Sequence, residues 1–454
     1  MQDNPTSMRV PDAGVRELFT LDARWQAWLD VEAALAKAEA ELDVIPADAA
    51  ETIVANARLA LLDRARVEEG LRRTAHPLVP LVWELARVCG DRAGGYVHWG
   101  ATTQNITQTG ELLLVRKAHR VFLRQIGAVL AVMADLAERT KDMALPGRTH
   151  GQHAVPATFG FKVGIWIDEL CRHVTRLRGA EPRVFCAMLG GAAGTFASFG
   201  ELGPKIQARM AAHLDMTPMP APARTVGDHM AEYVCLLGML AATCSKIARE
   251  IYTQMKQEFG EVEEPVPPGT VGSSTMPQKR NPKLTQDIVA AAAQLRALVP
   301  LALEAMQTEH EADRTTSLMM SQALRESCGL TSDILSRMEI LIPGLQVDAE
   351  RMRRNLDLSG GLIMGEALML SLGAHIGRQE AHDAIYDAAQ AAATGGESFQ
   401  SLLAKDETVR AHLNEAEIAA LLDPTAYTGQ CAAIAAEQAV RARAIAAELE
   451  AADG

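Results

Sequence analysis

Basic charge, aromatic side chains and β-strand signals are all scarce in this chain. The 44 Lys and Arg residues are outnumbered by 57 Asp and Glu, giving a formal net charge of −13. This argues against nucleic acid as a partner, because phosphate contacts need a basic surface. Aromatic residues make up only 4%. Alternating β-branched runs are few, and no Asn-Gly or Asp-Gly turn lies between such runs, which argues against a β fold.

The sequence also lacks metal-binding motifs, disulfide patterns and long apolar runs. Its seven cysteines include no CxxC pair, so we expect free thiols in a reducing compartment. No HExxH motif or Cys/His cluster occurs, and we expect no metal and no cofactor. Residues 1–5 are polar and show no signal-peptide core, and the most apolar run, 233–244, is too short to span a bilayer. We therefore expect a soluble, cytoplasmic protein that does not bind membranes.

Helix-forming residues are abundant. Ala, Leu, Glu and Arg are frequent and lose little freedom in a helix. Residues 25–42 show the period, with Leu29, Ala33 and Ala36 on one stripe. Long helical stretches are predicted at 111–141, 158–178, 229–259, 283–308 and 315–342. Helices of this length are typical of bundles, and small residues at 290–293 would let partner chains complete the bundle.

The chain has 454 residues, which is too long for one ordinary core. Breaks rich in Gly or Pro fall near 90–96 and 342–344. The sequence therefore predicts an all-α protein of three helical domains. These are an N-terminal domain at 1–95, a central long-helix bundle at 96–343 and a C-terminal domain at 344–454.

Three polar segments interrupt the helices, at 98–105, 147–154 and 262–282. The first carries Thr102, Thr103 and Gln104 ahead of the helix predicted from 111. Hydroxyls, amides and free backbone N–H groups at a helix start form an anion site, so this segment is a candidate carboxylate grip. The alternative is an ordinary helix cap.

The second polar segment contains His150 and His153 beside Gly151. Histidine exchanges a proton near neutral pH, so either side chain is a candidate general acid or base. The alternative is a structural pair with no part in chemistry.

The third polar segment is dense in helix breakers, with Pro265, Pro267, Pro268, Gly269 and Gly272. A loop of about twenty residues inside a helical protein is often a lid. It also carries two serines, a lysine and an asparagine close together. A serine acts as a base only if its oxyanion is stabilised, which backbone amides in a Gly/Ser turn and a nearby lysine can do. The alternative is a mobile hydrophilic loop.

Residues 272–282 match every fixed position of GSSxMPxKxNP, the signature loop of the fumarase/aspartase superfamily, which the chain resembles. The two other polar segments resemble that superfamily's shared regions in the same order. Residues 19–46 and 361–383 resemble its adenylosuccinate lyase and carboxymuconate cycloisomerase branch, so the similarity covers essentially the whole chain.

This resemblance implies an all-α subunit in a homotetramer, with three subunits building each active site. It implies anti elimination on a small dicarboxylate. A base removes the proton β to the leaving group, an aci-carboxylate forms and fumarate is released.

The resemblance also implies roles for individual residues. Ser273 would be the base, His150 the general acid and His76 a second active-site histidine. Lys279 and Asn281 would hold the carboxylate that becomes the aci-anion. Further substrate contacts would come from Thr102, Thr103, Gln104, Thr149, Ser274, Met276 and Arg16.

Several departures narrow the substrate. At 16–19, 227–229 and 317–321 the chain differs from the positions that serve the nucleotide in adenylosuccinate lyases. Gln278 replaces the usual histidine of cycloisomerases, and bacterial cycloisomerases lack the counterpart of His150. These differences favour a lyase that releases fumarate from a non-nucleotide substituted succinate, with an amine, amino acid or nitro-type nitrogen as leaving group.

Other functions stay open at this point. The alternatives are 3-carboxy-cis,cis-muconate cycloisomerase and, third, adenylosuccinate lyase. A non-enzymatic relative would be expected to have lost Ser273, His150 or Lys279, and all three are intact.

Overall fold

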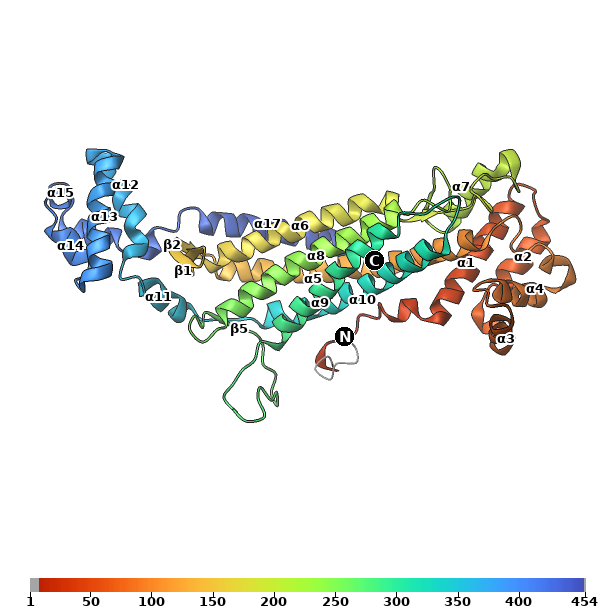
Figure 1. Ribbon diagram of the computed structural model, residues 1–454, viewed down its shortest axis with the longest axis horizontal. Helices are drawn as coiled ribbons and strands as arrows, with labels where there is room; N and C mark the ends of the chain where they lie inside the picture. Colours follow the sequence, from red (N-terminus) through yellow and green to blue (C-terminus); the bar gives the residue numbers. More distant parts are fainter. Residues whose placement is uncertain (1–7, 453–454) are drawn as a thin grey trace. The chain divides into compact units, whose positions relative to one another are not determined.

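The computed structural model describes residues 8–452, and residues 1–5, discussed above for their polarity, lie outside that range. Helices dominate, which confirms the predicted all-α class (Figure 1). In chain order they are α1 Leu21–Ala40, α2 Ala47–Asn56, α3 Arg64–Thr74, α4 Val79–Gly94, α5 Thr103–Arg139, α6 Phe159–Val184, α7 Gly203–His213, α8 Asp228–Gln254, α9 Lys283–Glu304, α10 Arg314–Gly344, α11 Ala349–Asp357, α12 Gly365–Ile376, α13 Arg378–Gly395, α14 Phe399–Lys405, α15 Glu407–Arg410, α16 Glu415–Leu421 and α17 Cys431–Ala451.

Strands are short and occur as three two-stranded ladders among the described residues. The longest pair is antiparallel, β1 Ala144–Thr149 with β2 Gln152–Thr158. The others pair β3 Cys186–Ala187 with β4 Thr217–Pro218, and β5 Val262–Glu263 with β6 Gln346–Val347.

The chain forms two compact units. The first comprises residues up to 125 together with 172–244 and 288–337, and the second comprises 126–171, 245–287 and 338 onward. Helices α5, α6, α8, α9 and α10 each contribute to both units. The division into domains at 1–95, 96–343 and 344–454 stays a prediction.

Helix α1 organises the N-terminal part of the first unit. Thr20 caps it by accepting the N–H of Ala23, and its buried stripe includes Trp25 and Leu29. This stripe packs against α2 and α7. The predicted helix at 25–42 is thus confirmed, because large apolar residues recur at helical spacing on one side.

In the second unit, the C-terminal helices surround a core of their own. Leu368 and Leu372 of α12 pack with Phe399 and Leu403 of α14 and with Ile385 of α13. The β1–β2 hairpin packs against α11. The hairpin is therefore attached to the folded body of the second unit.

Two sequence expectations need correction. The helix predicted from 111 begins at Thr103, so Thr103 and Gln104 lie in its first turn instead of ahead of it. Asn105 explains the early start, because its side-chain oxygen accepts the N–H of Thr102 at 3.0 Å and caps the helix. The β1–β2 hairpin was not predicted, because its turn is His-Gly and its strands contain proline.

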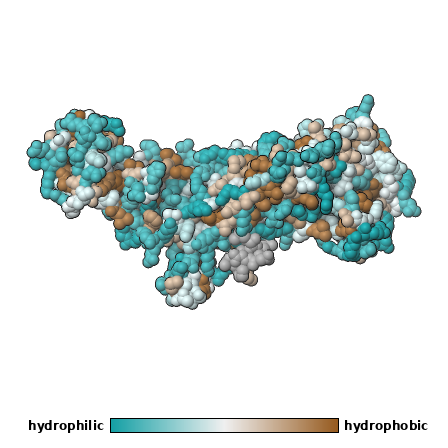
Figure 2. Space-filling view, viewed as in Figure 1, coloured by the Kyte–Doolittle hydropathy of each residue, from teal (hydrophilic) through white to brown (hydrophobic). Residues whose placement is uncertain are grey.

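Helices α8 and α9 are long and apolar enough to cross a membrane by length and composition alone, which the short run at 233–244 did not indicate. In α8, 56% of the most apolar stretch is buried, but only 28% of that in α9. Apolar residues gather over this part of the surface in Figure 2. In one isolated subunit α9 therefore leaves much apolar surface uncovered.

Candidate active site

A cavity of about 830 Å³ lies in the first unit. Its walls come from α1, the α3–α4 connection, the first turns of α5, residues 224–230 and the start of α10. His76, Thr102, Thr103 and Gln104, four of the predicted site residues, all line it. Segments that lie far apart in the sequence thus meet around one cavity.

His76 is held in one tautomer by the start of α4. Its Nδ1 accepts the backbone N–H groups of Leu78 at 3.3 Å and Val79 at 3.0 Å. The proton of a neutral imidazole must then reside on Nε2, which lies 3.4 Å from the Thr103 hydroxyl. The wall of the cavity therefore contains an N–H donor from His76 and a hydroxyl from Thr103.

Gln104 is fixed by an arginine that sequence reasoning missed. Its side-chain NH₂ donates to the carbonyl of Arg224 at 2.9 Å, and its oxygen accepts from Arg224 Nε at 3.0 Å. Arg224 also donates to the carbonyl of Ala192, and burial lowers the pKa of this guanidinium. Arg224 lies in a proline-rich connection, and no local motif marks it.

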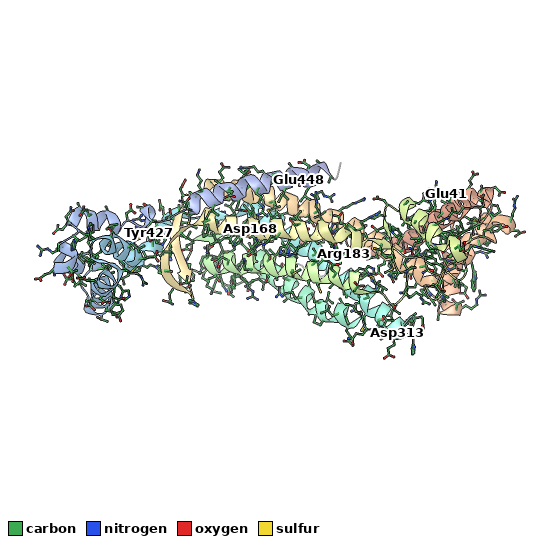
Figure 3. All side chains as sticks on the ribbon, turned by 90° about the horizontal axis from the view of Figure 1, so that it is seen from above. Glu41, Asp168, Arg183, Asp313, Tyr427 and Glu448 are labelled. Carbon is green, nitrogen blue, oxygen red and sulfur yellow. The ribbon has the colours of Figure 1, made fainter. Side chains whose placement is uncertain are left out.

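The cavity contains two further arginines that were not predicted, Arg24 of α1 and Arg314 of α10. Glu111 and Asp313 are the carboxylates among its lining residues, and Asp313, labelled in Figure 3, lies immediately before α10. Three arginines against two carboxylates make the lining net cationic in a chain of net charge −13. This local sign suits an anionic ligand.

The second polar segment is the turn of the β1–β2 hairpin, and Thr149 pairs with Gln152 across it. His150 and Gly151 occupy the two turn positions with φ of 53° and 79°. Positive φ at both positions matches the turn that joins twisted strands, and glycine adopts it without strain. His150 adopts it as an exposed residue at the tip, with its ring accessible.

A buried ion pair fixes the strand before this turn. Arg148 donates to both carboxylate oxygens of Glu261, at 3.0 and 2.5 Å, and Glu261 is 0% exposed. Asn355 donates to the same carboxylate at 2.8 Å. The guanidinium also lies 4.9 Å from the ring centroid of Phe259. Geometry this complete is what makes a buried pair stable.

His153 differs from His150 in its surroundings. It pairs with Arg148 in the ladder, and burial followed by the charge of Arg148 lowers the pKa of its imidazole. Its Nδ1 is buried with no hydrogen-bond partner within residues 8–452. His153 is therefore kept neutral inside the hairpin, while His150 stands at its exposed end.

Residues 262–282, the third polar segment, contain the signature motif and are called the signature loop from here on. This loop begins in β5, leads to α9 and projects from them in Figure 1. The Ser273 hydroxyl oxygen accepts the backbone N–H groups of Thr275 at 3.3 Å and Met276 at 3.1 Å. Two amide dipoles directed at one oxygen stabilise negative charge on it. Ser273 is thus the loop hydroxyl whose surroundings favour its acting as a base.

The loop closes on itself behind Ser273. Any side chain at Gly272 would collide with the carbonyl oxygen of Lys279, so only glycine fits. The Asn281 amide donates to the carbonyl of Gly272 at 2.6 Å. Ser274, Met276 and Lys279 are exposed on the outside of this closed turn.

Two neighbouring glutamates hold the loop at its base. Glu263 forms an exposed ion pair with Arg280 at 2.8 Å. Glu264 is buried and accepts the N–H groups of Leu284 at 3.1 Å and Thr285 at 3.2 Å, which are free donors at the start of α9. Burial raises the pKa of Glu264, and these amide bonds oppose the rise.

The predicted site residues thus fall into three groups. His76, Thr102, Thr103 and Gln104 line the cavity of the first unit. Thr149 and His150 lie on the hairpin turn, and Ser273, Ser274, Met276, Lys279 and Asn281 lie on the signature loop, both in the second unit. Arg16 joins none of these groups. It pairs with Asp333 of α10 at 2.7 Å and does not line the cavity.

The fold and these three segments define a helical enzyme with a cationic cavity and a serine loop. A family model described as Lyase matches residues 7–296, and one described as Adenylosuccinate lyase C-terminus matches 361–437. The chain belongs to the fumarase/aspartase superfamily, in the branch of adenylosuccinate lyases and carboxymuconate cycloisomerases.

Individual proteins with different activities resemble it over nearly their full length. An N-acetyl-S-(2-succino)cysteine lyase of Enterococcus italicus is 37% identical over 92% of both chains. A 3-carboxy-cis,cis-muconate cycloisomerase of Pseudomonas aeruginosa is 38% identical over 93% of this chain and 92% of its own. The crystal structure of a fumarate lyase from Mesorhizobium sp. BNC1 has a TM-score of 0.88 and 34% identity, covering 94% of this chain and 98% of its own.

Proposed function

We propose that this enzyme releases fumarate from a substituted succinate that carries no nucleotide, by anti β-elimination. The observation that carries the proposal is the Ser273 oxygen facing the N–H groups of Thr275 and Met276. A serine so placed can act as the base once its own proton has passed to solvent, because the two N–H groups stabilise the oxyanion that then takes the proton from carbon.

The remaining roles follow the elimination. Ser273 removes the proton β to the leaving group, and the electrons move into the adjacent carboxylate. Lys279 and Asn281 hold that carboxylate as it becomes the aci-anion, and His150 protonates the departing atom. Thr102, Thr103, Gln104 and the Nε2–H of His76 bind carboxylate oxygens of the succinyl unit. Thr149, Ser274, Met276 and Arg16 are proposed as further substrate contacts.

The leaving group is bonded to the succinyl unit through nitrogen or sulfur. A nitrogen leaving group fits the lyase side of the branch, to which the match at 361–437 belongs. Sulfur is supported by relatives named N-acetyl-S-(2-succino)cysteine lyase, at 37% and 35% identity. These names describe non-nucleotide substituted succinates.

The active form is proposed to be a cytoplasmic homotetramer. In each active site the three polar segments would come from three different subunits, one segment from each. The exposed apolar surface of α9 supports assembly, because other subunits can cover it. The charges on α8 support a bundle in water over a membrane span. Lys246 of α8 pairs with Glu169 of α6, and Glu250 of α8 pairs with Lys162 of α6 at 2.6 Å. All four residues belong to the second unit.

The proposal is tested by following fumarate absorbance with a panel of N- and S-substituted succinates. Fumarate should form from at least one of them, together with an equal amount of free amine or thiol. Release from none of them, combined with turnover of 3-carboxy-cis,cis-muconate, would refute it.

The second candidate function is 3-carboxy-cis,cis-muconate cycloisomerase, an intramolecular lactonisation that uses the same carboxylate contacts. It is favoured by the 38% identity to the Pseudomonas aeruginosa enzyme. Loss of carboxymuconate absorbance without fumarate release identifies it. Adenylosuccinate lyase is the third candidate, and cleavage of adenylosuccinate in the same assay would identify it.

A further inference from the structure

Two of the cavity's arginines, Arg24 and Arg314, pair with nothing in the described part of the chain, and Arg24 is the half-buried one of the two. Its guanidinium carbon lies 5.3 Å from the ring centroid of Trp28, on the same helix. Its side chain makes no hydrogen bond and no ion pair within residues 8–452. A half-buried guanidinium with five N–H donors and no acceptor in the described part of the chain leaves those donors available to water or to an anionic ligand.

The carboxylate that attracts Arg24 is engaged by other residues. Glu111 accepts the Ser321 hydroxyl at 2.6 Å and pairs with Arg325 at 3.6 Å. Burial lowers the pKa of Arg24, the positive charge of Arg325 lowers it further, and Glu111 opposes both effects. The local balance thus leaves one positive charge without a partner.

The cavity's other arginines are differently placed. Arg224 gives its donors to Gln104 and to the carbonyl of Ala192, and Arg314 is exposed to solvent. The cavity walls also include the buried side chains of Trp28, on which Arg24 stacks, and Met230. A half-buried, unpaired cation in a cavity that also has apolar walls fits a monoanion attached to a short carbon chain.

We propose that Arg24 binds a carboxylate carried by the leaving group. The substrate class would then be succinate joined through nitrogen or sulfur to an amino acid or a thiol acid. This inference rests on the proposed function, because Thr102 and Thr103 of the same cavity are assigned to the succinyl half. Arg24 determines specificity for the leaving group, and it has no part in the elimination itself.

Two substrates that differ by one carboxylate test the proposal. The S-(2-succino) adducts of N-acetylcysteine and of N-acetylcysteamine are otherwise alike. The wild-type enzyme should favour the first in kcat/KM by at least about tenfold, as expected for a hydrogen bond between charged groups. Arg24→Gln should lose roughly ten- to hundredfold on the first adduct and less than about threefold on the second. Arg24→Lys should retain part of the preference.

Arg73→Gln is the matched control. Arg73 also stacks on a tryptophan, 5.5 Å from the ring centroid of Trp83, but it is exposed and does not line the cavity. This variant should behave as wild type on both adducts. Thermal unfolding of Arg24→Gln should stay close to wild type and to the control, because each variant gives up one stacking contact on a tryptophan.

Several outcomes would overturn the assignment. Equal losses on both adducts in Arg24→Gln would place Arg24 at the succinyl half or in the fold. Stronger inhibition by inorganic phosphate than by N-acetylcysteine, abolished in Arg24→Gln, would make the anion a phosphate.

Failure of the proposed function would look different, since wild type would then release fumarate from neither adduct. Calorimetric titration with N-acetylcysteine and N-acetylcysteamine decides the role of Arg24 in that case. Binding of the first alone, lost in Arg24→Gln, supports the site, and any other pattern of binding overturns it.

Discussion

The hairpin turn and the signature loop carry the proposed acid and the proposed base, and they are held in contrasting ways. Arg148, next to the turn, pairs with Glu261, which is 0% exposed and also accepts from Asn355. The signature loop bonds chiefly to itself, as in the exposed Glu263–Arg280 pair. It is tied to α9 by the amide contacts of Glu264 and by Lys283, which donates to the carbonyl of Val271 at 2.8 Å.

The difference separates two tasks. A general acid must meet the departing atom in a fixed direction, and a turn attached to a buried ion pair maintains that direction. A loop held to the body by few contacts can close over a substrate while keeping its internal geometry. We therefore expect damage at the hairpin to lower stability first and damage in the loop to lower turnover first.

The largest expected effect is on stability, from Arg148→Met. It leaves the buried carboxylate of Glu261 without a counter-charge, which should lower the free energy of unfolding by about 3–5 kcal/mol. The matched variant is Arg280→Met, which breaks the loop's pair with Glu263, whose partners are 59% and 30% exposed. That loss should be at most about 1 kcal/mol. Urea unfolding measures both, and similar losses in the two variants would remove the contrast.

The next effect is on turnover, from Ser273→Ala. Without the hydroxyl no oxygen occupies the position facing the N–H groups of Thr275 and Met276, and kcat should fall at least about 10²-fold. Fumarate release measures it, with the free energy of unfolding expected to stay near wild type. A fall of less than about tenfold would move the base to another residue. Gln278→Ala, elsewhere on the exposed loop, serves as the control.

A more selective effect is expected from His150→Asn. Asparagine tolerates the φ of 53° at this turn position but cannot donate a proton as histidine does. Turnover should fall by roughly ten- to hundredfold for poor leaving groups that need protonation, and less for good ones. Turnover is compared across succinate adducts of thiols that differ in the pKa of the free thiol. An unchanged rate with the poorest leaving group would contradict the role of His150 as the acid.

These contrasts show what the sequence could and could not reveal. The polar segments were found because they interrupt helical periodicity, and the signature loop because glycine and proline exclude regular structure there. The long helices followed from composition and spacing, although Asn105 starts α5 earlier than predicted. Local pattern sufficed for these features, but it missed the β1–β2 hairpin, whose turn is His-Gly and whose strands contain proline.

Features that depend on distant partners were missed. Arg148 and Glu261 are 113 residues apart, and nothing in either segment specifies the other. Arg24 lies in an ordinary amphipathic helix, where an unpaired arginine cannot be told from a solvated one. Arg224 reaches Gln104 across 120 residues. Tertiary packing decides such contacts, and a single sequence does not encode it in any local period.

The smallest effect concerns how the stability of the protein responds to the titration of Glu264. Glu261 is paired with an arginine, whereas Glu264 meets only amides and a hydroxyl, and burial raises the pKa of Glu264 above 4.5. The folded state therefore binds that proton more tightly than the unfolded state does, and its contribution to stability is lost as pH rises from about 4.5 through the folded-state pKa. Glu264→Gln should remove this pH-dependent contribution to stability. The free energy of unfolding of the variant relative to wild type should therefore increase with pH between about 4.5 and the folded-state pKa of Glu264. Urea unfolding at a series of pH values measures the difference, and a difference that stays flat or falls with pH would contradict a raised pKa of Glu264 in the folded state.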